Sequence, residues 1–236
     1  MLSSSLPSIR KHSDFIIEDV IDDDACFYRA LANQLFYLSY YHKSIVILSK
    51  NNKLVTKKIT QVLGNTLWSY QGYEQTKMAK VLQQRARNYI YKNKDIMIDD
   101  LGITAQELAI HTHNISSVEQ DYNGWELIEI YNELYKTFAG DDKQPSDFIP
   151  WGGASEQWAL SEYLKMPIIV YMLHHYNKNK NKIYQGRIYK NTAARNSYFK
   201  PIQIFGLKYT NTSPSINLLF KKTKKGPHYL SLYEKV

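Results

Sequence analysis

Apolar residues recur at helical spacing directly after the first cluster of acidic residues in the chain. The stretch CFYRALANQLFYLSYY begins at Cys26 and contains neither Gly nor Pro. Its apolar residues share one face of a helix: Phe27, Ala30, Leu31 and Leu35. This spacing is typical of an amphipathic helix, because 3.6 residues complete each turn. The pattern therefore predicts a helix that begins at or near Cys26.

Further helical patterns fill the middle of the chain. The clearest are KMAKVLQQRARNYIY and NGWELIEIYNELYKTF. Between them, Thr104 and Glu107 have the spacing of a capping box, in which each side chain binds the backbone N–H of the other residue. The stretch AGDDKQPSDFIPWGGAS then breaks the regular pattern. Ser155 precedes another helical stretch, EQWALSEYL, and we expect Ser155 to cap that helix.

The helical pattern gives way to short strand-like runs after Met166. These runs are rich in β-branched and aromatic residues and are separated by Gly, Pro, Asn and Ser: PIIVYML, KIYQGRIYK, PIQIFGLKY, SINLLFKK and HYLSLYEK. DFIIEDVI, near the N-terminus, is a further candidate strand. Helices followed by strands predict an α+β fold, with the helices packed on a small, mostly C-terminal β-sheet.

Length and composition favour one domain. The chain has 236 residues, 44% of them apolar, which is enough to bury a core, and it shows neither an internal repeat nor a long linker. We expect a flexible lead-in over residues 1–14 and a single domain over residues 15–236. The chain has no apolar run of membrane-spanning length and no secretory signal, and its single cysteine cannot form an internal disulfide. These features favour an intracellular, cytoplasmic protein that does not bind a membrane.

Charge is distributed unevenly along the chain. Residues 177–236 contain 13 lysines and arginines and one acid, which gives this segment a charge of +12, whereas the whole chain carries +8. Such a segment attracts polyanions. The sequence has no RNA-binding motif, however, and a lysine-rich segment is more often a solvated surface. Nucleic acid is therefore an unlikely partner.

Cys26 is the only cysteine, and its place at a predicted helix start raises the question of reactivity. Unpaired N–H groups at a helix N-terminus favour a thiolate. Asp22, Asp23 and Asp24 oppose a thiolate by charge repulsion. A lone cysteine can equally be a small buried apolar residue, so the local sequence leaves both interpretations open. His228 follows a Gly-Pro turn at the start of the last strand-like run and is a candidate base.

Two histidine-rich stretches suggest metal binding only weakly. They are HTH at residues 111–113 and HH at residues 174–175. The chain has no second cysteine and no acidic cluster beside them to complete a zinc site. We therefore expect no metal and no cofactor.

Three segments resemble, in order, motifs of the ovarian-tumour (OTU) family of cysteine proteases, which are mainly deubiquitinases. DDDACFYRALANQL is similar to the family's Asp-Gly-x-Cys-Leu-Phe-Arg-Ala box. WGGASEQWALSEYLKMPIIVY resembles its Trp-Gly-Gly-x-x-Glu-x-x-Ala-Leu-Ser segment, and PHYLSLYE resembles its His-Tyr box. The resemblance covers about residues 15–40 and 148–234. It implies a papain-like, OTU-type domain with a helical insertion around residues 41–78.

The resemblance also implies a role for each matching residue. Cys26 would be the nucleophile and His228 the base, while Asp23 would hold either the loop before Cys26 or the histidine. Backbone N–H groups of this loop, at Asp24 and Ala25, would stabilise the oxyanion. The substrate would contact four further residues: Trp151, Gly152, Gly153 and Tyr229. The implied reaction is thiol-dependent hydrolysis after the C-terminal glycine of ubiquitin, polyubiquitin or a ubiquitin-like modifier.

Two residues depart from the family's pattern. Asp24 stands where the Cys box usually has Gly, and Leu230 stands where many members have an Asn or Asp that orients the histidine. Either Asp23 or another polar group orients His228, or the enzyme works with a looser dyad. These departures leave open an alternative function, a catalytically weak OTU-like module that binds ubiquitin without cutting it. A basic nucleic-acid-binding protein is the more distant alternative.

Overall fold

A computed structural model describes the backbone of most of the chain. The described residues are 10–11, 14–41, 45–48, 54–57, 72–117, 124–138, 151–177, 182–185, 197–223 and 226–234. The α-helices are α1 (Cys26–Tyr41), α3 (Gly72–Lys92), α4 (Ala105–His113), α5 (Leu127–Leu134) and α6 (Ala154–Leu164). The strands are β1 (Arg10–Lys11), β2 (Phe15–Glu18), β3 (Ile45–Leu48), β4 (Leu54–Lys57), β5 (Met97–Ile98), β6 (Ile103–Thr104), β7 (Ile168–Asn177), β8 (Lys182–Gln185), β9 (Ser197–Phe205), β10 (Ile216–Lys222) and β11 (Pro227–Glu234).

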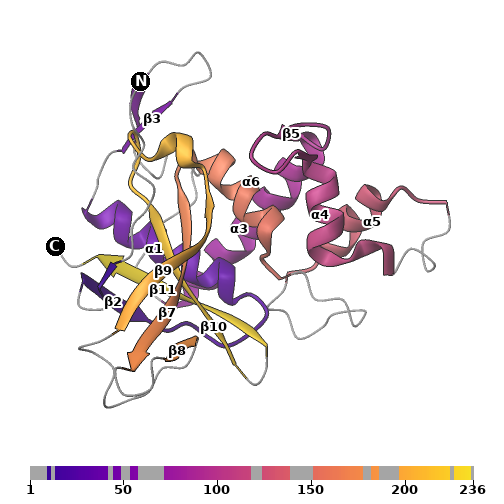
Figure 1. The fold of residues 1–236 in the computed structure, drawn as a ribbon. Coiled ribbons are helices and arrows are strands. Elements are labelled where there is room, and N and C mark those ends of the chain that lie inside the picture. Colours follow the sequence, from indigo (N-terminus) through magenta and orange to yellow (C-terminus); the bar gives the residue numbers. More distant parts are fainter. Residues whose placement is uncertain are drawn as a thin grey trace.

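One mixed sheet joins the two ends of the described chain. Its strands lie in the order β1-β9-β7-β10-β11-β2, and β8 pairs with β7. The β7–β10 pair is parallel, whereas the other pairs are antiparallel. Helices α3 to α6 gather to one side of this sheet (Figure 1). The predicted α+β fold with a mostly C-terminal sheet is therefore confirmed.

The main core lies between the sheet and the helices. The four residues that predicted the α1 face are all buried: Phe27, Ala30, Leu31 and Leu35. Helix α1 contacts β11 and β10 on one side and α3 on the other. A smaller apolar cluster includes Phe15, Leu219, Leu230 and Leu232. This packing fixes the N-terminus of α1 beside the start of β11, the two places from which the candidate nucleophile and base come.

The predicted ends of the helices are partly correct. Helix α1 begins at Cys26, and the Thr104–Glu107 capping box before α4 is confirmed in both directions. The expected cap at Ser155 is wrong, because α6 begins at Ala154, two residues before the expected start at Glu156, with Gly153 at the N-cap position. The reason is that the Glu156 carboxylate reaches back 2.8 Å to accept the Gly153 N–H, which leaves Ser155 inside the first turn.

Two segments have strands that the sequence analysis did not anticipate. Residues 45–57, within the insertion expected to be helical, include β3 and β4, which pair with each other. The runs IVIL and LVTK are rich in β-branched residues, which favour an extended backbone. Residues 58–71 of the expected insertion lie outside the described residues. Within the expected lead-in, Arg10 and Lys11 pair with β9 as strand β1.

Candidate active site

Cys26 lies against an unpaired edge of β11. Strand β2 pairs with β11 from Glu234 back to Ser231 and leaves the ladder after Glu18. The Tyr229 N–H therefore has no strand partner on this side, and it donates instead to Cys26 Sγ at 3.5 Å. The thiol is also 4.0 Å from the Pro227 carbonyl oxygen, on the other side of His228. The thiol thus contacts the backbone of β11 on both sides of His228, and Cys26 is only 5% exposed.

His228 is held between two carboxylates of the loop that follows β2. Its Nε2 is 2.8 Å from Asp19 Oδ1, and its Nδ1 is 3.1 Å from Asp22 Oδ1. The Asp19 contact has hydrogen-bond geometry. The Asp22 oxygen lies within ion-pair distance of Nδ1 but lacks hydrogen-bond geometry, and the two groups attract as ions only when the imidazole is protonated. The imidazole is almost fully buried, with 1% of the side chain exposed.

Asp19 is therefore the group that orients His228 in this structure. Burial alone would raise the pKa of Asp19, but the hydrogen bond from His228 and the charges of Lys221 and His228 lower it overall. Asp19 thus stays ionised. Sequence reasoning missed this residue, because it precedes the motif that matches the Cys box. The position expected from the family holds Leu230, which is buried among apolar side chains.

Asp23 holds the loop. Its carboxylate accepts hydrogen bonds from Arg29 Nε and Nη2, at 2.9 and 2.7 Å, and from the Ala25 N–H at 3.1 Å. Arg29 in turn donates to the Thr76 hydroxyl on α3. Among the hydrogen bonds and ion pairs of the described residues, none joins Asp23 to His228. The resemblance implied that Asp23 holds either the loop before Cys26 or the histidine, and these contacts match the role of holding the loop.

The Asp24 N–H in the loop before Cys26 has no hydrogen-bond partner among the described residues. The Cys26 N–H donates to the Asp23 carbonyl and the Ala25 N–H to the Asp23 carboxylate. No hydrogen bond of the described residues uses the Asp24 N–H. The non-glycine residues with positive φ in the described segments are Asn114 and Lys165, so Asp24 needs none of the backbone freedom of the usual Gly.

The thiol is protonated in this arrangement. Burial is the largest influence on Cys26 and raises its pKa to about 11. The Tyr229 N–H lowers this pKa, the charges of Asp23 and Asp22 raise it further, and the Phe27 N–H lowers it. Burial therefore outweighs the favourable position at a helix N-terminus. No hydrogen bond within the described residues joins the thiol to the His228 ring.

The Trp151–Gly153 segment lies against the first turn of α1. A Cβ atom on Gly152 would stand 1.8 Å from Phe27 Cδ1, so only glycine allows this approach. The side chain of Trp151 remains 46% exposed. Tyr229 packs its ring 5.4 Å from that of Phe27, and its hydroxyl accepts a hydrogen bond from Gln157. The structure thus brings two of the four expected substrate contacts, Gly152 and Tyr229, against Phe27 in the first turn of α1, and Trp151 and Gly153 adjoin Gly152 in the chain.

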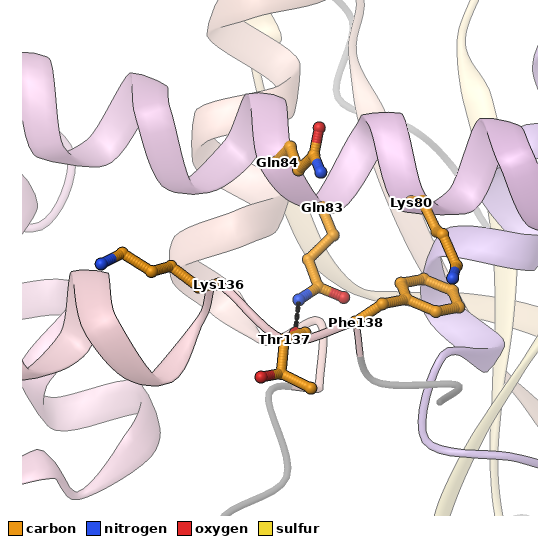
Figure 2. Close-up of a pocket in the computed structure, with 6 residues that line it drawn as sticks. All are labelled: Lys80, Gln83, Gln84, Lys136, Thr137 and Phe138. Atoms are coloured by element: carbon orange, nitrogen blue, oxygen red, sulfur yellow. Dashed lines mark hydrogen bonds between the residues drawn. The ribbon is translucent and has the colours of Figure 1, made fainter. Parts of the chain in front are cut away.

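Two other kinds of candidate site, a metal centre and a surface hollow, offer fewer reactive side chains. Within the described residues, no three His, Cys, Asp or Glu side chains gather as metal ligands. A hollow of about 340 Å³ lies between α3 and the end of α5 and is lined by Lys80, Gln83, Gln84, Lys136, Thr137 and Phe138 (Figure 2). The Phe138 ring, which lines the hollow, is 5.9 Å from the guanidinium of Arg29, the residue that pairs with Asp23.

Comparison with known proteins finds similar structures but no similar sequence. The chain matches no protein-family model and no curated protein. The viral OTU domain protease from Farallon virus is 14% identical, with a TM-score of 0.42 over 98% of this chain and 90% of that chain. The viral OTU domain protease from Taggert virus is 14% identical, with a TM-score of 0.41 over 97% of this chain and 86% of that chain. The OTU domain of OTUD1 is 10% identical, with a TM-score of 0.36 over 94% of this chain and 87% of that chain.

The helices of the described residues include none that is long and apolar enough to cross a membrane.

Proposed function

We propose that this chain is a thiol-dependent protease of OTU type that hydrolyses the bond after the C-terminal glycine of ubiquitin or a ubiquitin-like modifier. One observation carries the proposal. The only cysteine lies against the edge of the strand that bears a buried histidine, and a carboxylate orients that histidine. A thiol, a base and an orienting acid are the components of nucleophilic catalysis. The three ordered sequence motifs support the choice of substrate.

The first step is proton transfer from Cys26 Sγ to His228 Nδ1. It requires Asp22 to move away from Nδ1 and the imidazole to turn toward the thiol. Asp19, which accepts from Nε2, fixes the tautomer in which Nδ1 is the free base and then stabilises the imidazolium that forms. The thiolate next attacks the carbonyl carbon of the substrate glycine. The unpartnered N–H of Asp24 is the available donor to the resulting oxyanion.

The second half of the reaction restores the enzyme. His228 gives its proton to the leaving amine as the C–N bond breaks, which leaves the glycine as a thioester on Cys26. His228 then removes a proton from water, which attacks the thioester and releases the free carboxyl group. The exposed side chain of Trp151 and the glycines after it line the approach to this carbon.

A non-cutting ubiquitin-binding module is the second candidate. It is favoured by the buried, protonated thiol and by the Asp22 carboxylate beside the nitrogen that should act as base. The same substrate-facing residues serve either function. Turnover of a ubiquitin substrate that is lost in Cys26→Ala excludes the module.

The direct test is reaction with ubiquitin that carries a C-terminal cysteine-reactive group. Wild type is compared with Cys26→Ala and His228→Ala. We expect a covalent adduct in wild type, none in Cys26→Ala and a slower one in His228→Ala. If no adduct forms and ubiquitin binds tightly without a covalent bond, the protease hypothesis is rejected in favour of the non-cutting module.

A further inference from the structure

A buried polar cluster lies behind the Trp151–Gly153 segment. At its centre Glu156 is completely buried, and its two carboxylate oxygens are 3.0 and 2.9 Å from His113 Nε2. The Tyr131 hydroxyl and the Ser155 hydroxyl each donate to Glu156 Oε1 at 2.9 Å. Burial alone would raise the pKa of Glu156, but His113 and the hydrogen bonds from the Gly153 N–H and the Tyr131 hydroxyl lower it. A carboxylate is thus kept ionised in the interior, where charged groups are retained only with full pairing.

The cluster ties down both ends of the three-residue segment. The Gly153 N–H donates to Glu156 Oε2 at 2.8 Å. The Tyr135 hydroxyl donates to the Trp151 carbonyl oxygen at 2.9 Å and lies 2.7 Å from the ring nitrogens of His113. Gly152, between these two anchors, packs on the Phe27 ring. Only the Trp151 side chain projects into solvent.

The two tyrosines have different tasks in this cluster. Tyr131 and Tyr135 are one helical turn apart, both are fully buried, and their rings lie 4.5 Å apart. Among the hydrogen bonds of the described residues, the Tyr131 hydroxyl donates to the Glu156 carboxylate, which has other partners. The Tyr135 hydroxyl is the side-chain group that holds the backbone of Trp151.

We infer that Tyr135 is a positioning residue for substrate binding. It fixes the Trp151 carbonyl and thereby sets the direction of the exposed indole, next to Gly152 on the first turn of α1, for contact with the substrate segment that leads to the scissile bond. This inference rests on the proposed function for the identity of the substrate. The anchor itself, however, is a property of the free protein and can be tested separately.

The experiment compares Tyr135→Phe with Tyr131→Phe, a matched control that also removes one buried hydroxyl from the cluster. Both variants are made in the Cys26→Ala background, and their affinity for ubiquitin is measured by titration. Loss of one hydrogen bond changes an equilibrium by about fivefold. We expect the dissociation constant to rise about fivefold in Tyr135→Phe and to stay within about twofold in Tyr131→Phe. Trp151→Ala should weaken binding, and adding Tyr135→Phe to it should have little further effect.

Two further measurements separate this inference from the proposed function. Amide hydrogen exchange of the free protein should be faster in the peptide that contains residues 151–153 in Tyr135→Phe but not in Tyr131→Phe. Iodoacetamide should alkylate Cys26 at the same rate in both variants made with the cysteine intact. Equal exchange in the two variants, or additive effects of Tyr135→Phe and Trp151→Ala on affinity, would overturn the inference. Absence of turnover in wild type would refute only the protease.

Discussion

Burial is the main cause of the raised pKa of the Cys26 thiol, and the charge of Asp22 is the smaller contribution that can be removed most cleanly. Its carboxylate stands 3.1 Å from His228 Nδ1, and its charge raises the pKa of Cys26. We predict that Asp22→Asn makes Cys26 more reactive for two reasons. It removes a charge that opposes the thiolate, and it frees the nitrogen that should take the thiol proton.

The size of the effect follows from the thiol pKa. A pKa of about 11, against an ordinary value of 9.0, leaves roughly 0.1% thiolate at pH 8 instead of roughly 10%, so wild type should alkylate about 100-fold more slowly than a free cysteine. The Asp22 side chain is 42% exposed, so solvent screens its charge. Its removal should lower the pKa by about 0.5–1 unit, which corresponds to about three- to tenfold faster alkylation.

The assay is the rate of iodoacetamide alkylation between pH 6 and pH 10, followed by mass spectrometry. Because the chain has one cysteine, every alkylation event reports on Cys26. Asp24→Asn is the matched control, since it changes the charge equally and Asp24 is not among the main influences on the pKa of the thiol. Equal rates in Asp22→Asn and Asp24→Asn, or a wild-type thiol that titrates below about pH 8, would refute this reasoning.

Three other perturbations have defined outcomes. Asp19→Asn should reduce kcat for a ubiquitin amide substrate at least about tenfold with little change in KM, because the imidazolium loses its carboxylate; a kcat equal to that of Asp24→Asn would contradict the role of Asp19. Gly152→Ala should lower the free energy of unfolding in urea by about 1–3 kcal/mol, because the added Cβ overlaps the Phe27 ring; an unchanged midpoint would show that the contact is loose. The pKa of Glu156 is lowered in the folded state, so this residue adds stability above pH 4.5, the ordinary glutamate value, and loses it as the pH falls through the folded-state pKa. The melting temperature should therefore drop on acidification below about pH 4.5, and it should drop less steeply in Glu156→Gln.

Local patterns predicted the parts of the fold that depend on neighbouring residues. The start of α1 at Cys26 follows from its apolar spacing, and the capping box at Thr104 follows from the chemistry of two side chains three residues apart. The pairing of β3 with β4 was not predicted, because each short run acquires its structure by pairing with the other. Ser155 was misjudged because Glu156 satisfies the helix start from inside the helix.

The candidate site was predictable only in part for the same reason. Cys26 and His228 belong to motifs that can be recognised in the sequence. Asp19 meets His228 only because β2 pairs with β11, and the two residues are 209 positions apart. Nothing in the sequence next to Asp19 indicates this contact. The buried state of the thiol likewise depends on how the strand edge packs against the helix start.

The pairing of β2 with β11 also has a consequence for the life of the chain before folding is complete. Cys26 and Tyr229, which touch in the folded protein, are separated by 203 positions. At a synthesis rate of about 5–20 residues per second, the thiol leaves the ribosome roughly 10–40 s before the strand that brings its base. During this interval no catalytic pair exists, and the long-range closure that creates it forms slowly. A nascent or truncated chain that lacks β11 therefore carries the Cys26 thiol without His228, so the proposed cleavage activity would begin only when β11 has docked.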